Sequence, residues 1–537
     1  MKDYVIRNKM LFILLLLAFF SIQSMASITT KSATFDEVQY YGIGKYLIKE
    51  HKWDIMGAIL HPPLSYYLNS VPLLFVNEDK DIWKYDVKER NLEFLGAIDY
   101  YRGQELLSSP LNANDRLLIC SRVMTLLLAL LLGVYVYRFS SLMFGTAGGL
   151  ISLFFFTFCP NILAYSGICV PDMPLTVFTL ITIYYLWRCF NGSGRLGVIP
   201  AGFFLGLALL SKFTALLLIP IVLILTALIM FMQKLNLIPK LLLIYGIAAL
   251  VLFAGYQFEV TPLIQGNQYR LMQQGYGQGV FLMGQYSNHG WWYFYPLTVL
   301  MKTPIPVLLL FPLAIYLLLK VKATNMSFLA FMLVPILVFS AVFIFSGYSV
   351  GLRYLLPVYP FAFVLLGAVS LASLKLRYFI GATAIWYVLS ALYVSPHYLA
   401  YFNEAVGGPG NGYRYLVDSN LDWGQDLKGL KKFMDNNNIN KISLSYFGAD
   451  SPRRYGINYD WLPSHYLYNQ EPDKPYDIYA NQFVAISATN LQGVYLENRD
   501  MYKPLLEYEP IAKIGYSIFI YDMSGKGKHL KYSPGHV

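Results

Sequence analysis

Charged residues are scarce in this 537-residue chain: they make up 13% of it, about half the share that a soluble protein of this length carries. Hydrophobic residues make up 56%, and they come in long runs. This composition excludes an ordinary soluble enzyme and predicts a polytopic α-helical membrane protein. The net charge of +10 does not indicate nucleic-acid binding, because lysines and arginines in loops that set membrane topology account for much of it.

Cysteine is rare as well. The four cysteines all lie in or beside apolar runs: Cys120, Cys159, Cys169 and Cys189. We therefore expect neither a disulfide framework nor a thiolate metal site. The sequence also has no visible internal repeat and no low-complexity tract. The missing repeat counts against a transporter built from two inverted halves.

Apolar runs predict about eleven membrane spans, with the N-terminus inside and the C-terminus outside. The runs are 8–27, 116–138, 144–164, 172–190, 198–232, 240–257, 296–320, 327–346, 351–372 and 376–395. The run 198–232 is too long for one crossing of about 20 residues. Because basic residues flank it on both sides, we expect a helical hairpin with Lys212 at its outer apex. A retained first helix is favoured over a cleaved signal peptide ending at "SMAS".

Three regions are predicted to lie on the outer side of the membrane. The first, 28–115, contains an amphipathic stretch at 37–50 that is predicted to form a helix along the interface. The second, 258–295, is rich in Gln, Gly and Tyr and is typical of a mobile loop. The third, 396–537, follows the membrane domain (1–395) as a domain of its own.

The C-terminal region alternates between predicted strands and helices. The strands are "KISLSYFGA" (441–449), "QFVAISATN" (482–490) and "YSIFIYD" (516–522). A helix is predicted over "GQDLKGLKKFMDNNN" (424–438) and a longer one near 491–508. This alternation predicts a small α/β domain with a partly parallel sheet.

The unusual polar residues map to one side of the predicted membrane. They are Asp36, Glu37 and His61 in the first outer region, Asp172 in the next outer turn, and Arg122, Lys212, Lys302 and Arg353 near the outer ends of spans. Charges within membrane helices are costly and usually face a cavity or a partner. The sequence therefore predicts that these acids and bases converge on one outer-face site.

This mixture of charges suits a particular chemistry. Cations at the membrane surface suit the phosphate of a lipid-linked substrate. A carboxylate beside them suits a general base that takes a proton from an attacking hydroxyl. Sugar transfer from a polyprenyl phosphate, with an oxocarbenium-like transition state, needs both.

Several segments stand out along the chain: the acidic pair after the first span, "HPPL" and "PD" in the first two outer loops, "LALLSKFTALLLIP", "WWYFYPLTVLMKTPIP", "GLRYLLPVYPF" and "VDSNLDWGQDL". Together they resemble the GT-C membrane glycosyltransferases, in particular the family 39-like group of protein O-mannosyltransferases and aminoarabinose transferases. The resemblance covers the membrane part and the start of the outer domain. The longer segments are similar to those of bacterial members of the group.

The resemblance implies roles for individual residues. Asp36 would be the catalytic base, Glu37 a donor or metal contact, and Asp172 an acceptor-positioning or metal-binding acid. Lys212 and Arg353 would bind the lipid phosphate, and the positions of Arg122 and Lys302 add them to that set. Two departures argue against inheriting protein mannosylation as the activity: "HPPL" runs into Ser65 and Tyr66 rather than toward a lysine, and no sugar-binding repeat domain is inserted.

Each of these residues also has a structural interpretation. In this interpretation the acidic pair lies in a solvated loop or caps a helix, and His61 belongs to the Pro-Pro break. Asp172 is an N-cap, and Arg122 pairs with Asp115. Lys302 and Arg353 are interface anchors. His289 would join Glu37 or Asp36 at a divalent metal, although a lone histidine is more often structural. The segment 418–427 either begins the first helix of the outer domain or contacts substrate.

The sequence thus predicts an inverting glycosyltransferase of a bacterial-type inner membrane. It would move a sugar from a polyprenyl-phosphate carrier to a protein, lipid or glycan acceptor on the outer side. A transporter or flippase for a lipid-linked substrate is the alternative, and an assembly subunit that works through its outer domain is a third. Convergence of the charges at one face, rather than at mid-membrane, disfavours transport.

Overall fold

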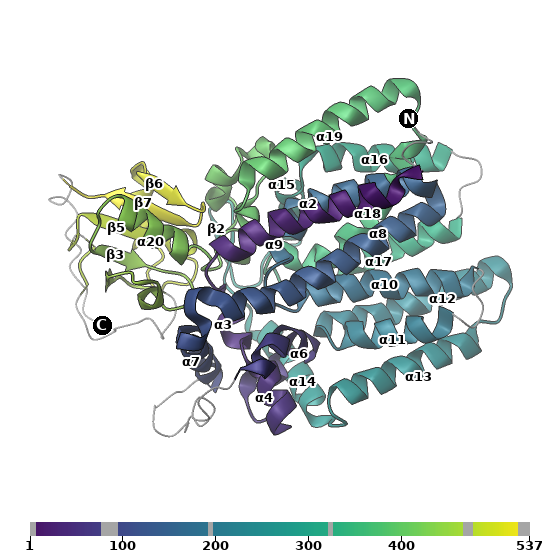
Figure 1. The fold of residues 1–537 in the computed structure, drawn as a ribbon, viewed down its shortest axis with the longest axis horizontal. Helices are drawn as coiled ribbons and strands as arrows, with labels where there is room; N and C mark the ends of the chain where they lie inside the picture. The colour runs from purple at the N-terminus through teal and green to yellow at the C-terminus, as the bar shows by residue number, and fades with distance from the viewer. Residues whose placement is uncertain are drawn as a thin grey trace.

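The computed structural model describes residues 7–76, 95–191, 197–320, 326–464, 476–478 and 480–524. A bundle of roughly aligned helices fills most of the molecule, and a small α/β domain lies at the end opposite the N-terminus (Figure 1). The helices of the bundle are α2 (Lys9–Thr30), α8 (Arg116–Thr157), α10 (Asp172–Phe190), α11 (Val198–Leu209), α12 (Leu218–Gln233), α13 (Ile238–Gly255), α16 (Ile305–Lys320), α17 (Met326–Phe345), α18 (Tyr359–Leu366) and α19 (Leu374–Val394).

Helix α8 folds back on itself at Gly145. This glycine has φ 67° and ψ −174°, a conformation that interrupts the helix. The two halves then pack side by side: Ser152 Oγ donates a hydrogen bond to Ser140 Oγ at 2.8 Å. A Cβ at Gly133 would lie only 2.8 Å from the ring of Phe156. The two spans predicted over 116–138 and 144–164 are therefore confirmed.

The long apolar run 198–232 also forms two helices. Helix α11 ends at Leu209, Lys212 is extended, and a short 3₁₀ helix (η6, Phe213–Leu217) leads into α12. Lys212 lies next to the start of α10, at the apex between α11 and α12, as the predicted hairpin requires. The two helices separate rather than pair, because α11 packs mainly on α10 and α13 whereas α12 packs mainly on α17.

Among the described residues, eight helices are long and apolar enough to cross a membrane, or nine if one bent pair forms a single span. That count treats α8 as one helix and leaves out α11, whose 12 residues reach only about 18 Å. Counting both halves of α8, the bent pair and α11 gives the eleven crossing segments that were predicted.

The segment 296–320 departs from its prediction as one continuous span. It consists of α15 (Phe294–Lys302) and α16, which bend by 106° relative to each other. Pro304 lies in the break, where its missing N–H and the restriction it places on Thr303 disfavour a continuous helix. The outer half of this segment therefore folds across the end of the bundle.

The first outer region forms short helices: α3 (Phe35–Tyr40), α4 (Ile43–Glu50), α5 (Met56–Leu60), α6 (Leu64–Ser70) and α7 (Leu95–Ser108). The single interfacial helix predicted over 37–50 is wrong. Gly42 is left-handed, with φ 86°, and breaks it. Tyr40, Tyr41 and Leu47 are buried under neighbouring segments instead of lying along the membrane surface.

The region 258–295 is also more ordered than predicted. It contains α14 (Thr261–Tyr276) and an antiparallel hairpin of β1 (Val280–Leu282) and β2 (Gln285–Ser287). The prediction of a loop failed because this helix is polar and has no continuous apolar face, so periodicity did not reveal it.

The C-terminal domain is built on a five-stranded sheet of order β4-β3-β5-β7-β6. The strands are β3 (Ile442–Ser445), β4 (Tyr459–Trp461), β5 (Phe483–Ser487), β6 (Ala512–Ile514) and β7 (Ile518–Asp522). β3 runs parallel to β4 and β5, while β7 is antiparallel to β5 and β6. The partly parallel sheet, its three predicted strands and the helix α20 (Leu427–Asn436) are confirmed.

The longer helix predicted near 491–508 is wrong. Only α21 (Ala488–Leu491) and a 3₁₀ helix at Lys503–Glu507 form there. Gly493 has φ 65°, and a Cβ on it would lie 2.1 Å from the carbonyl oxygen of Arg499. The chain therefore turns sharply at this glycine, where a helix would have to continue.

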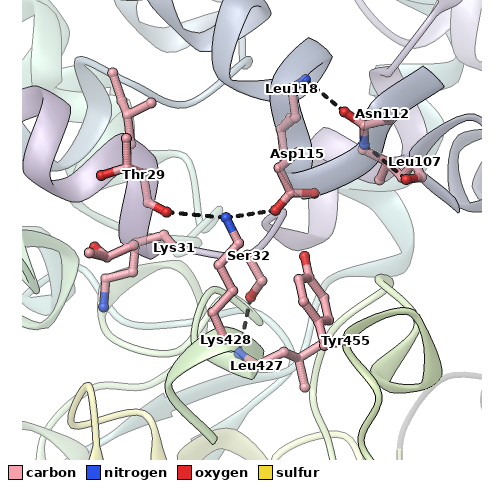
Figure 2. A network of polar contacts seen from close by, with 12 residues as sticks. Thr29, Lys31, Ser32, Leu107, Asn112, Asp115, Leu118, Leu427, Lys428 and Tyr455 are labelled. Atoms are coloured by element: carbon pink, nitrogen blue, oxygen red, sulfur yellow. Dashed lines mark hydrogen bonds and ion pairs between the residues drawn. The ribbon is translucent and has the colours of Figure 1, made fainter. Parts of the chain in front are cut away.

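A polar junction joins α20 to the membrane part (Figure 2). Lys428 Nζ lies 2.6 Å from Asp115 Oδ2 and donates to the carbonyl of Thr29 at 3.2 Å. The backbone N–H of Leu427 donates to Ser32 Oγ at 3.1 Å. The start of the outer domain is thereby bonded to the segment that directly precedes Asp36 and Glu37.

Candidate active site

Glu37 lies where three chain segments meet. Its Oε2 accepts hydrogen bonds from N and Oγ1 of Thr34 at 2.8 and 3.0 Å, which caps α3. Its Oε1 accepts from the backbone N–H of Cys169 at 2.9 Å, and Arg122 binds both carboxylate oxygens at 2.9 and 2.7 Å. Burial raises the pKa of Glu37, but the Arg122 charge and these hydrogen bonds outweigh it and hold that pKa below its ordinary value.

Arg122 uses all five of its N–H donors on the protein. Two bind Glu37, and the others reach the carbonyls of Ile28, Lys31 and Ser32 at 2.7–3.0 Å. No donor remains for a lipid phosphate, and the oxygens of Glu37 are already occupied. The geometry therefore favours a structural role for this pair over the phosphate and metal roles predicted for it.

Asp36 makes a different contact from its neighbour. Its Oδ2 accepts from Arg353 Nη1 at 2.7 Å, and both side chains keep some exposure, 17% for Asp36 and 12% for Arg353. Arg353 lies in the 3₁₀ helix η7 (Leu352–Val358), with its guanidinium 4.5 Å from the ring centre of Trp423. Its Nε has no hydrogen-bond partner. The unused Nε donor is buried, while the partial exposure of the two side chains leaves one edge of the pair open.

A second acid–base pair lies beside the first. Asp172 is the first residue of α10, where the helix dipole favours a negative charge. Lys212 Nζ donates to its Oδ1 at 2.8 Å and lies 3.9 Å from the ring centre of Tyr354, which follows Arg353 directly. Asp172 Oδ2 is buried without a hydrogen-bond partner. The break between α11 and α12 is what brings Lys212 to this place.

Arg270 belongs to the site, and sequence reasoning missed it. It lies on α14 and donates to His61 Nε2 at 2.7 Å and to the carbonyl of Leu60 at 3.0 Å. Tyr40 Oη lies 2.9 Å from the same His61 nitrogen. Arg270 is the one lysine or arginine in 258–295, and that was the only signal available.

Burial, together with the positive charges of Arg270, Lys212 and Arg353, lowers the pKa of His61 well below its ordinary value. The imidazole is therefore neutral at pH 7, and its Nε2 can accept the Arg270 hydrogen bond. His61 thus acts as an uncharged support that orients a cation.

Three of these residues, His61, Lys212 and Arg270, line a cavity of about 200 Å³, together with Tyr348 and with Tyr354, the neighbour of Arg353 in the chain. The lining also includes apolar residues, among them Leu216, Leu271 and Val342, which are 43%, 61% and 39% exposed. The cavity lining therefore combines cations with exposed apolar side chains, a pattern that suits an amphipathic anion.

Lys302 and His289 lie apart from this arrangement. Lys302 Nζ donates to the carbonyls of Leu399 and Asn420 at 2.8 and 2.5 Å, so it bonds the outer segment to α15. The backbone N–H of His289 donates to Ser287 Oγ at 3.1 Å. Within the described part of the chain no group of three or more His, Cys, Asp or Glu could hold a metal ion. The geometry gives no support to the phosphate role of Lys302 or to a metal at Glu37 and His289.

This architecture is similar to that of known proteins. Residues 117–256 match the family model described as dolichyl-phosphate-mannose-protein mannosyltransferase. The apo crystal structure of ArnT from Cupriavidus metallidurans superposes with a TM-score of 0.51 at 12% sequence identity, covering 94% of this chain and 97% of ArnT. The chain has the GT-C fold. The expected resemblance to this group is confirmed.

A second ArnT structure, bound to undecaprenyl phosphate, aligns with a TM-score of 0.49, at 12% identity and with the same coverage. A search of curated proteins finds no significant match. The segment matched by the family model includes Asp172 and Lys212 of the GT-C bundle, whereas Asp36, Arg270 and Arg353 lie outside it. The site in this chain is therefore assembled from the matched segment and from flanking regions that only the fold brings together.

Proposed function

We propose that this chain is a glycosyltransferase that uses a polyprenyl-phosphate-linked sugar as donor. The observation that carries the proposal is the pairing of Asp36 with Arg353 next to Tyr354, which lines a cavity that contains both cations and exposed apolar side chains. The apolar side chains suit the prenyl chain, and the cations suit the phosphate. The match of residues 117–256 to a dolichyl-phosphate-dependent family supports the same donor class.

In the proposed reaction the acceptor hydroxyl attacks the anomeric carbon of the sugar. The bond from that carbon to the phosphate oxygen breaks, and its electron pair leaves with the phosphate. Asp36 takes the proton of the attacking hydroxyl. Lys212, Arg270 and Arg353 offset the charge that develops on the leaving phosphate. A single displacement of this kind inverts the configuration of the sugar.

Arg353 has two partners in this scheme. In the structure it binds Asp36 at 2.7 Å, and its Nε is unused. An incoming phosphate would compete for the guanidinium, because charge-assisted contacts with phosphate are among the strongest that arginine makes. Donor binding would thereby release Asp36 to accept a proton, so that the base becomes active only when the leaving group is in place.

We further propose that the site faces the outer side of a plasma or inner membrane. Asp172 and Glu259 are the only acids of residues 116–395. At the end of the bundle near the N-terminus, the described helix ends and the connections between them carry basic residues and no acid: Arg138, Arg188, Lys234, Lys240, Lys320, Lys375 and Arg377. By the positive-inside rule that end is cytoplasmic, which puts the site and the C-terminal domain outside.

The acceptor in this reaction is a protein, a lipid or a glycan, and the transferred sugar is a hexose or a pentose. Asp172 is the proposed acceptor-positioning residue, because its buried Oδ2 has no partner in the protein and can accept a hydrogen bond from a substrate hydroxyl.

The test is Asp36→Asn in proteoliposomes supplied with a labelled polyprenyl-phosphate sugar. The amide keeps the shape of the side chain but cannot take the proton, so release of free polyprenyl phosphate should fall at least about 100-fold. Asp435→Asn, the same change at an exposed carboxylate of α20, is the matched control and should retain full activity. Near-normal transfer by correctly inserted Asp36→Asn would refute the role of Asp36. Movement of label across the bilayer without phosphate release would instead identify a transporter.

A further inference from the structure

The segment 417–426, which we call the junction segment, links the helical bundle to α20 and packs against the residues around the site. Tyr165 Oη donates to the carbonyl of Ser419 at 3.0 Å. The backbone N–H of Leu352, next to Arg353, donates to Asn420 Oδ1 at 3.0 Å. The junction segment is therefore bonded both to the short helix that precedes α10 and to the 3₁₀ helix that carries Arg353.

Trp423 of this segment contacts Arg353 and the residue that directly precedes Asp36. Its indole ring lies under the Arg353 guanidinium, 4.5 Å from ring centre to Cζ. Its carbonyl accepts the backbone N–H of Phe35, the residue directly before Asp36, at 2.8 Å. Trp423 is 2% exposed, so this cation–π contact is largely shielded from water, where such contacts are strongest.

The outer domain in turn fixes Trp423. Gly424 has φ 83°, and a Cβ on it would lie 2.9 Å from Gly448 Cα, so a glycine is needed for this close approach. Tyr446, directly after β3, donates from its hydroxyl to the Gly424 carbonyl at 2.6 Å. Gln425 Oε1 accepts the N–H of Trp423 at 2.7 Å. These contacts account for the glycine and the glutamine that follow Trp423 in the sequence.

We propose that Trp423 is a positioning residue of the transfer reaction and that the outer domain completes the active site through it. The inference rests on the proposed glycosyltransferase function. Stacking restricts the plane of the guanidinium, so Arg353 can exchange Asp36 for the donor phosphate without losing its orientation. The Phe35 hydrogen bond fixes the backbone of the base. The Arg353 guanidinium and the backbone of Asp36 are thereby held in the narrow range of positions that a displacement reaction requires.

The experiment compares Trp423→Phe with Trp423→Leu in the full-length protein. Both replacements fill part of the buried space, but only phenylalanine keeps an aromatic face for Arg353. The readouts are kcat and donor KM for polyprenyl phosphate release, acceptor KM, and the thermal unfolding midpoint in detergent. Trp461→Leu, the same change on β4, serves as the matched control away from the site.

We expect Trp423→Phe to stay within about 3-fold of the wild type. Trp423→Leu should lower kcat over donor KM by about 10-fold, with acceptor KM unchanged and an unfolding midpoint close to that of Trp423→Phe. Equal activity of the two variants would overturn the inference, as would an activity loss that merely follows the unfolding midpoint, as in Trp461→Leu.

The two proposals fail in different ways. If the wild type releases no polyprenyl phosphate from any lipid-linked sugar, the proposed function fails and the role of Trp423 fails with it. If the wild type is active and Asp36→Asn is inactive while Trp423→Leu keeps full activity, only the role of Trp423 is refuted.

Discussion

Two adjacent carboxylates, Asp36 and Glu37, have different environments because an α-helix turns about 100° per residue. Glu37 is fully buried and bonded to Arg122 and to the N–H of Cys169. Asp36 reaches Arg353 at the partly exposed edge of the site. Their separation depends on partners 85 to 317 residues away in the chain, so local sequence could identify the pair but not divide its roles.

Arg122 and Arg270 give contrasting predictions, one about stability and one about donor binding. Arg122→Gln leaves the buried Glu37 without its charge partner, which costs about 3–5 kcal/mol of stability. Arg270→Gln removes a cation from the cavity wall, so the donor KM should rise about 10-fold or more while stability changes less. Thermal unfolding in detergent and the donor dependence of polyprenyl phosphate release measure the two effects separately.

A stable Arg122→Gln protein with a raised donor KM would contradict this division and return Arg122 to the phosphate site. Glu37→Gln provides a second check. It should lower the unfolding midpoint, because the neutral amide cannot bind Arg122 through two acceptor oxygens. Loss of transfer at an unchanged midpoint would mean that Glu37 acts in the reaction itself.

At the scale of elements, the site depends on places where helices stop. The break between α11 and α12 puts Lys212 beside Asp172. The reversal of α8 at Gly145 sends the chain back toward the end of the bundle where α10 begins with Asp172.

The reversal at Gly145 gives a prediction about stability. Its φ of 67° with ψ of −174° is a region open essentially to glycine alone, and a Cβ there would meet no atom within 4 Å. Gly145→Ala should therefore destabilise the protein by about 1–3 kcal/mol through backbone strain alone. Gly246→Ala, within α13 and equally free of neighbours, should be neutral or stabilising by up to about 1 kcal/mol.

Thermal unfolding of both variants in one detergent compares them directly. Equal unfolding midpoints would mean that the reversal at Gly145 does not require a glycine.

At the scale of the whole molecule, the features predicted correctly are those that short stretches of sequence encode. Hydropathy predicted the spans because the apolar run of each span is contiguous in the sequence. The alternation of strands and helices predicted the sheet of the C-terminal domain, and the position of charged residues near span ends singled out Asp36, Asp172, Lys212 and Arg353. Helix α14 and Arg270 were missed because a polar helix packed across the end of a membrane bundle carries neither signal.

We expect the contact between the bundle and the C-terminal domain to respond to pH through Asp422. This carboxyl group in the junction segment is fully buried; it accepts the N–H of Thr489 at 2.9 Å, and its Oδ1 has no partner. Burial raises its pKa to about 8. The folded protein thus holds a proton that the unfolded chain releases near pH 4, so this contribution to stability is lost as pH rises toward 8, by at most about 1.4 kcal/mol per pH unit.

Asp422→Asn should remove that dependence, because the amide is neutral at every pH and its oxygen can still accept from Thr489. The unfolding midpoint of the wild type should fall relative to that of Asp422→Asn between pH 6.5 and pH 8.5. Asp99, whose pKa burial raises to about 7, titrates in both proteins and cancels in the comparison. Parallel midpoints across this range would show that Asp422 is already ionised in the folded protein. A widening gap would mean that a neutral carboxyl group holds the junction next to Trp423.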